Sequence, residues 1–91
     1  MARKEPRPET RKIAKKAVDT ERAEQVLNEV DEDLQPDSKA GEALREAAAE
    51  ETAELAEEAA DLARRRASDK IEAEDVAKAN ERHQDREERA S

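Results

Sequence analysis

The side chains of this sequence that could bind a ligand are mainly basic, and they gather in two segments. The first segment is the N-terminal arm, which holds Arg3, Lys4, Arg7, Arg11, Lys12, Lys15 and Lys16. The second contains Arg64, Arg65, Arg66 and Lys70. Guanidinium and ammonium groups bind phosphate oxygens, so both segments are candidate contacts for a nucleic-acid backbone.

Each basic segment also has an explanation that needs no ligand. The cations at residues 64–70 follow a long predicted helix, and its C-terminal dipole and nearby glutamates would attract them. The arm could fold onto an acidic surface of the same protein. The sequence leaves both explanations open beside phosphate binding.

Neither catalysis nor metal binding is expected. The single histidine, His83, lies in a polar segment and is predicted to be a surface residue, and the chain has no cysteine. One histidine and one glycine cannot supply a nucleophile–base set, a phosphate-cradling loop or a cluster of metal ligands. We therefore expect no enzymatic activity, no cofactor and no metal.

Charge is distributed unevenly along the 91 residues. Residues 1–18 have a net charge of +5 and the remainder −13, which gives −8 in total. An acidic chain without aromatic residues is typical either of disorder or of a protein that works in molar salt. Arginine outnumbers lysine eight to three beyond residue 18, which favours a halophilic protein.

The spacing of apolar residues predicts an all-α chain. Residues 9–18 form a short basic amphipathic helix. Asp19 and Thr20 both offer N-cap side chains for a helix that ends at Pro36. Its apolar stripe repeats at intervals of three and four residues and comprises Ala23, Val26, Leu27, Val30 and Leu34.

Two further helices are predicted. The second extends from about residue 38 to residue 66, capped by Asp37 or Ser38, and Gly41 in its first turn would permit close approach of a neighbour. A short third helix covers residues 72–80, and a polar tail, frayed or disordered, follows it. The domains expected are thus an arm at 1–18, a helical domain at 19–82 and a tail at 83–91.

Burial favours an oligomer. The chain has eleven valine, leucine and isoleucine residues and no aromatic residue, so a monomer would have little core. A helix over residues 38–66 would span about 43 Å, more than so small a domain can cover by itself.

No apolar run is long enough for a membrane span, and the arm lacks the apolar stretch of a secretory signal. We expect a soluble cytoplasmic protein without membrane contact.

The order of short, long and short helices is the layout of the histone fold. Residues 59–79 carry the more specific likeness, in particular the pattern Ile-x-x-Glu-Asp-Val-x-x-Ala that begins at Ile71. This segment resembles the end of the central helix, the second loop and the final helix of archaeal histones and related histone-fold subunits. The resemblance covers about 60 of the 91 residues.

The resemblance implies an intertwined head-to-tail dimer in which the long helices cross near their middles. The expected dimer interface consists of Leu44, Ala48, Leu55, Ala59, Leu62, Ile71 and Val76. It also implies that duplex DNA is held at phosphates by the two loops and by the start of the first helix. Lys39 in the first loop would then lie near Arg64–66 across the dimer.

The chain departs from the family pattern in both loops. The family has an arginine and a threonine ahead of an aspartate; these two positions fall on Ser68 and Lys70, and Asp75 matches the aspartate. We therefore predict that no Arg–Asp clamp spans the second loop and that Ser68 is available to bond Asp75. The first loop, residues 31–39, is mainly acidic.

The sequence-based hypothesis is a histone-like architectural protein of an archaeal nucleoid that binds duplex DNA non-specifically as a homodimer or homotetramer. One alternative is a histone-fold module, such as a transcription-related subunit, that pairs with another histone-fold chain and never touches DNA. A second alternative is an antiparallel helical bundle unrelated to histones.

Overall fold

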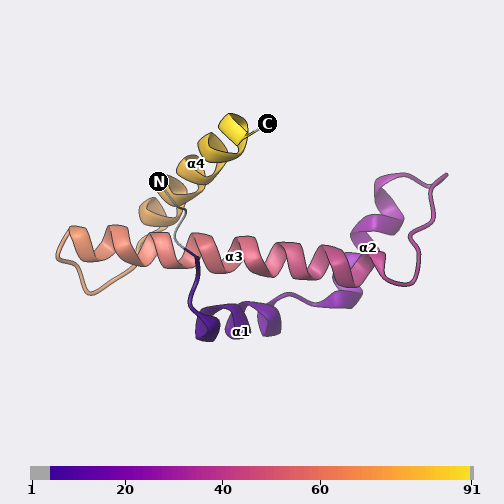
Figure 1. Cartoon of the computed structure of the whole chain (residues 1–91), viewed down its shortest axis with the longest axis horizontal. Coiled ribbons are helices and arrows are strands. Elements are labelled where there is room, and N and C mark those ends of the chain that lie inside the picture. Colours follow the sequence, from indigo (N-terminus) through magenta and orange to yellow (C-terminus); the bar gives the residue numbers. More distant parts are fainter. Residues whose placement is uncertain (1–4, 91) are drawn as a thin grey trace. The chain divides into compact units, whose positions relative to one another are not determined.

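The computed structural model describes residues 5–90 as four α-helices, with no strand in that range (Figure 1). The helices are α1 (Pro8–Ala17), α2 (Thr20–Val30), α3 (Ala40–Arg65) and α4 (Ala73–Ala90). The all-α prediction is confirmed. The chain divides into two compact units, Met1–Ala53 and Glu54–Ser91, which are described in turn.

In the first unit, α1 and α2 begin where local chemistry favours a helix. Pro8 occupies the start of α1, where its missing N–H has no intrahelical partner to lose. The basic last turn of α1 complements the helix dipole. At α2 the Asp19 carboxylate accepts a hydrogen bond from the Glu21 amide at 2.9 Å, which confirms the predicted N-cap.

The predicted end of α2 at Pro36 is wrong. The helix ends at Val30, and Leu34 lies outside it. The Asp31 carboxylate accepts a hydrogen bond from the Asp33 amide at 2.9 Å, and the Leu34 amide donates to the Asp31 carbonyl at 3.1 Å. This aspartate turn satisfies backbone groups locally, and so it competes successfully with another turn of helix.

The start of α3 is shaped by an aspartate and a glycine. The Asp37 carboxylate accepts from the Lys39 amide at 2.9 Å, and the helix begins at Ala40, two residues later than predicted. Gly41 is buried, and a Cβ added there would overlap the Glu24 side chain at its Cγ. The expected close approach at this glycine is confirmed, and the neighbour is α2.

The core of the first unit is built from alanine. Ala14 of α1 packs with Ala49 and Ala53 of α3, and half-buried Val18 lies against them. Figure 1 shows α1 alongside the middle of α3. Small side chains let the two helices approach closely, but each of them removes little apolar surface from water.

The second unit contains the last part of α3, a loop and α4. Its buried apolar residues are Ala59, Ala63 and Ala79. α4 continues to Ala90, ten residues past the predicted end. Ion pairs explain the extension, because Arg82 and Arg86 both reach Glu58 of α3, at 3.5 and 2.8 Å.

Large apolar side chains are left uncovered in the single chain. Among residues 5–88, no valine, leucine or isoleucine is buried. The most exposed are Ile13, Val26, Val30, Leu34, Ile71 and Val76. Of the predicted interface residues, Ala59 is buried, Ile71 and Val76 are exposed, and the others, Leu44, Ala48, Leu55 and Leu62, are half-buried. Within the described range, no helix combines the length and apolarity that crossing a bilayer requires.

Candidate nucleic-acid interface

The loop after α3 begins with a tight helix ending. Ala67 has a φ of 56°, in the left-handed region that usually favours glycine. The Ser68 amide donates to the Ala63 carbonyl at 3.0 Å and the Ala67 amide to the Arg64 carbonyl at 2.9 Å. These two bonds form a Schellman motif, which turns the chain sharply just after Arg66.

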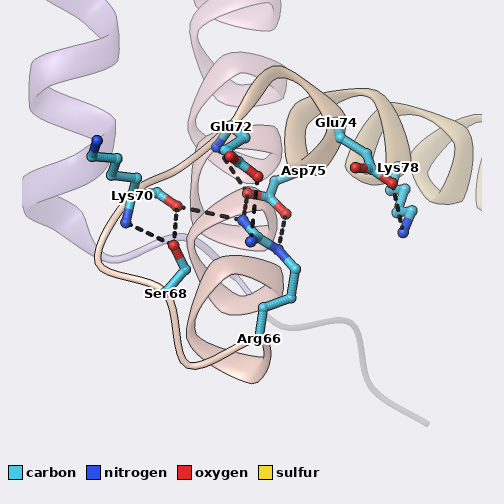
Figure 2. Close-up of polar contacts among 7 residues, drawn as sticks. All are labelled: Arg66, Ser68, Lys70, Glu72, Glu74, Asp75 and Lys78. Atoms are coloured by element: carbon cyan, nitrogen blue, oxygen red, sulfur yellow. Dashed lines mark hydrogen bonds and ion pairs between the residues drawn. The ribbon is translucent and has the colours of Figure 1, made fainter.

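Arg66 forms an ion pair with Asp75 across this loop (Figure 2). Its Nε donates to Asp75 Oδ1 at 3.1 Å and its Nη2 to Oδ2 at 2.5 Å, a two-bond fork. Nη1 also lies 3.3 Å from a carboxylate oxygen of Glu72. The prediction that no Arg–Asp clamp spans the loop is therefore wrong.

The physical reason for this error is a shift of two positions. Ser68 occupies the place of the expected arginine, but Arg66 precedes the left-handed turn at Ala67 and still reaches Asp75. Ser68 bonds instead with Lys70: its hydroxyl donates to the Lys70 carbonyl at 3.2 Å and accepts from the Lys70 amide at 3.1 Å.

Asp75 joins the loop to the start of α4. Only 2% of its surface is exposed, and Oδ2 also accepts from the Glu72 amide at 2.8 Å. In this bond the residue preceding the helix donates its amide to the side chain of the third helical residue, which is half of a capping box. The hydrogen bonds from Arg66, and next the bond from the Glu72 amide, hold the pKa of the Asp75 carboxyl below its ordinary value.

The cations of the second basic segment are thereby divided by role. Arg66 is committed to Asp75, and Arg64 pairs with Asp61 on α3. Arg65 and Lys70 are exposed, and within the described residues neither side chain has an ion-pair partner. Two cations, one at the last residue of α3 and one on the hydrogen-bonded loop that follows, are thus available to an anionic ligand.

The described part of the arm contains α1, which is docked on α3. Arg11 of α1 donates to Glu50 Oε1 of α3 from Nη2 at 2.7 Å and from Nε at 3.2 Å. Arg45 of α3 donates to the carbonyls of Lys15 and Val18, at 2.6 and 3.0 Å. The explanation in which the arm folds onto its own acidic neighbour therefore applies to Arg11.

The remaining predicted cations differ in their surroundings. Lys12, Lys15, Lys16 and Lys39 are exposed, and their ammonium groups have no ion-pair partner in the described part of the chain. Arg7 is exposed and has an interaction of its own. Arg3 and Lys4 lie outside the described residues.

His83 was predicted to be a surface residue, and the structure instead buries it to 5% exposure. Its Nδ1 lies 3.7 Å from a Glu54 carboxylate oxygen and its Nε2 3.4 Å from one of Glu87. The burial of His83 was not predicted because only apolar residues were used to define the buried face of α4. His83 follows Ala79 by four residues and continues that face.

Among the described residues, no group of three or more histidine, cysteine or acidic side chains is placed to hold a metal ion.

Arg45 and Glu50 are two further residues that the sequence analysis overlooked. A signal for Arg45 exists in the sequence: Arg45, Ala49 and Ala53 repeat every four residues, and so they share the face of α3 that covers α1.

Comparisons with models of protein families, with curated proteins and with solved structures found no match to this chain.

Proposed function

We propose that the chain is a histone-fold protein that dimerises and binds duplex DNA non-specifically through phosphate contacts. The observation on which this proposal chiefly rests is the structure of the loop between α3 and α4, residues 66–72, which corresponds to the second loop of the histone fold. There the Arg66–Asp75 clamp fixes the backbone while Arg65 and Lys70 stay exposed and unpaired within the described residues.

The order of the helices supports the fold part of the proposal. α2, α3 and α4 have 11, 26 and 18 residues, so a long central helix is flanked by two shorter ones. The arginine–aspartate clamp adds to the resemblance in residues 59–79, because that feature of the family is present with a shifted arginine. A membership of the archaeal histone family is part of this proposal.

The exposed apolar residues support the dimer. Val26 and Val30 on α2 and Val76 on α4 are 59%, 74% and 47% exposed in the single chain. Leaving such side chains in water forgoes roughly 1.5–3 kcal/mol for each one that a partner could bury. A second copy crossing α3 would cover them, since the expected interface residues Leu44, Leu55 and Leu62 are also only half-buried.

The DNA part can be tested by fluorescence anisotropy with a labelled duplex of about three helical turns. The full chain is compared with an Arg65→Gln/Lys70→Gln double variant over a series of potassium chloride concentrations. Losing two phosphate contacts should make the slope of log affinity against log salt shallower by about 1.8.

The matched control is a Lys78→Gln/Arg82→Gln variant, which loses the same charge on α4. Its slope should stay close to that of the unmodified chain. The proposal is wrong if the unmodified chain fails to bind at the lowest salt, or if both double variants change the slope equally.

An acidic first loop favours one other function, a protein–protein module that does not bind DNA. Asp31, Glu32 and Asp33 are exposed beside Leu34, which is 64% exposed. A surface that combines apolar and acidic groups suits a basic protein partner better than phosphate. Absence of duplex binding together with a stable mixed dimer with another histone-fold chain would favour this function.

A further inference from the structure

The surface of α1 is divided into a docked face and a basic face. Ala14 is buried and Val18 half-buried against α3, while Lys12, Lys15 and Lys16 are exposed. Lys12 and Lys16 are one helical turn apart, and Lys15 is three residues from Lys12. Residues at these intervals have Cβ atoms about 5–6 Å apart, so the three lysines form one cluster on the helix surface.

Two contacts hold α1 in this orientation. The first is the Arg11–Glu50 pair, which joins residues 39 positions apart through two hydrogen bonds to one carboxylate oxygen. Donation of these hydrogen bonds to Glu50 is also the main reason that the pKa of the Arg11 guanidinium lies above its ordinary value. This pair fixes the middle of α1 on α3.

The second contact fixes the end of α1. The Arg45 guanidinium of α3 donates to the carbonyls of Lys15 and Val18, in the last turn of α1 and just beyond it. Carbonyls at a helix C-terminus lack intrahelical partners, so a donor from another helix both satisfies them and sets the helix direction. The lysines of the basic face are therefore presented by a helix that is held at two points.

We propose that α1 is a phosphate-binding surface preset on α3. Lys12, Lys15 and Lys16 contact the backbone of duplex DNA, and Arg11, Arg45 and Glu50 are positioning residues. This inference rests on the proposed function and deepens it. The basic face of α1 is then the surface of the arm that meets the duplex. Arg11, which the sequence predicted as a DNA contact, binds Glu50 and does not contact phosphate.

The composition of the face favours a duplex over a lipid surface. Ile13, 68% exposed, is the one large apolar residue on α1 outside the docked face. A helix that lies in a membrane interface needs a broad apolar face to insert. Three clustered ammonium groups without such a face suit the closely spaced phosphates of a duplex.

The contacts are tested with a Lys12→Gln/Lys15→Gln/Lys16→Gln variant of the full chain in the duplex titration. Loss of three phosphate contacts should make the salt slope shallower by about 2.7. An unchanged slope in a chain that binds duplex would overturn this inference and leave the proposed function standing. No duplex binding by the unmodified chain at the lowest salt would overturn both, as would binding to anionic phospholipid vesicles alone.

The positioning role is tested by two variants with equal charge. Glu50→Gln removes the partner of Arg11, and Glu46→Gln removes an exposed glutamate one turn earlier on α3, for which no ion pair is present among the described residues. Charge alone predicts that both variants bind the duplex equally and slightly more tightly.

If α1 must be preset, Glu50→Gln binds several-fold more weakly than Glu46→Gln, because ordering the released helix then opposes binding. Hydrogen exchange of the α1 amides in the free protein should be faster in Glu50→Gln alone. Equal affinities, or tighter binding by Glu50→Gln, would contradict a positioning role.

Discussion

The two compact units use the same chemical pair, an arginine that forks onto a carboxylate, in different surroundings. In the first unit the Arg11 and Glu50 side chains are 34% and 41% exposed and 39 positions apart. In the second, Asp75 is almost fully buried and only nine positions from Arg66. The two pairs therefore differ in whether water can solvate the charged groups when the pair breaks.

Water can solvate Arg11 and Glu50 when their pair breaks, so this pair contributes little to stability and mainly selects where α1 lies. Water cannot reach Asp75 as readily, and its carboxylate also accepts from the Glu72 amide. Removing Arg66 therefore leaves a buried carboxylate without its charged partner, and removing Asp75 takes away the acceptor of both the Arg66 guanidinium and the Glu72 amide. We infer that the second pair stabilises the loop, whereas the first orients a helix.

The largest expected effect is that of Asp75→Ala. It removes the partner of Arg66 and half of a capping box, so the midpoint of thermal unfolding should fall by roughly 10 °C. Glu50→Ala, which breaks the exposed pair, should lower it by about 2 °C or less. Thermal unfolding followed by circular dichroism measures both. Equal shifts would show that burial does not distinguish the two pairs.

Acid should weaken the buried pair in a defined direction. Because the folded pKa of Asp75 lies below its unfolded value, its contribution to stability is present above the ordinary aspartate pKa of about 3.9 and is lost as pH falls through the lower, folded value. Asp75→Asn should lack this part of the acid dependence. Urea unfolding of both chains at several pH values measures it, and parallel curves for the two chains would contradict the assignment.

Gly41→Ala should destabilise the first unit. The new Cβ would overlap the Glu24 side chain, and overpacking of this kind costs about 1–3 kcal/mol, against a gain in helix propensity of at most about 1 kcal/mol. Chemical unfolding gives the net change.

Glu24→Ala in the same chain should remove the overlap and reverse the loss. The Gly41→Ala/Glu24→Ala chain should then be at least as stable as Glu24→Ala alone. Additive effects of the two substitutions would show that Glu24 does not limit the space at Gly41.

The smallest expected effect has the opposite sign. Ala67 adopts a left-handed conformation that costs an L-residue about 1–2 kcal/mol, and glycine would avoid this cost while adding freedom to the unfolded chain. Ala67→Gly should therefore raise the free energy of unfolding by about 1 kcal/mol or less. A loss of stability would mean that the Schellman turn before the clamp is not strained.

Much of the fold could be predicted from the sequence, because it depends on local signals. Apolar spacing and Asp19 located α1, the start of α2 and most of α3. The errors came from polar contacts, which spacing of apolar residues does not reveal. Asp31 ends α2 early through its own turn, and Glu58 extends α4 through two arginines.

In the candidate site, too, the positions of the charged residues could be predicted from the sequence, whereas their polar contacts could not. Both basic segments were evident from composition, but composition cannot tell a paired cation from an exposed one. Arg11 and Arg66 are committed to Glu50 and Asp75. The left-handed turn at Ala67, which brings Arg66 within reach of Asp75, is a backbone conformation that alanine rarely adopts, so no sequence signal indicated it.

The most direct test of a dimer that binds DNA is sedimentation equilibrium of a duplex mixed with the full chain. The chain has no aromatic residue, so absorbance at the wavelengths of the bases reports the duplex alone. With a DNA-binding dimer, the duplex gains mass in steps of two chains at low salt and returns to its free mass at high salt. A duplex that sediments at its free mass at the lowest salt, or that gains mass in steps of one chain, would contradict a DNA-binding dimer.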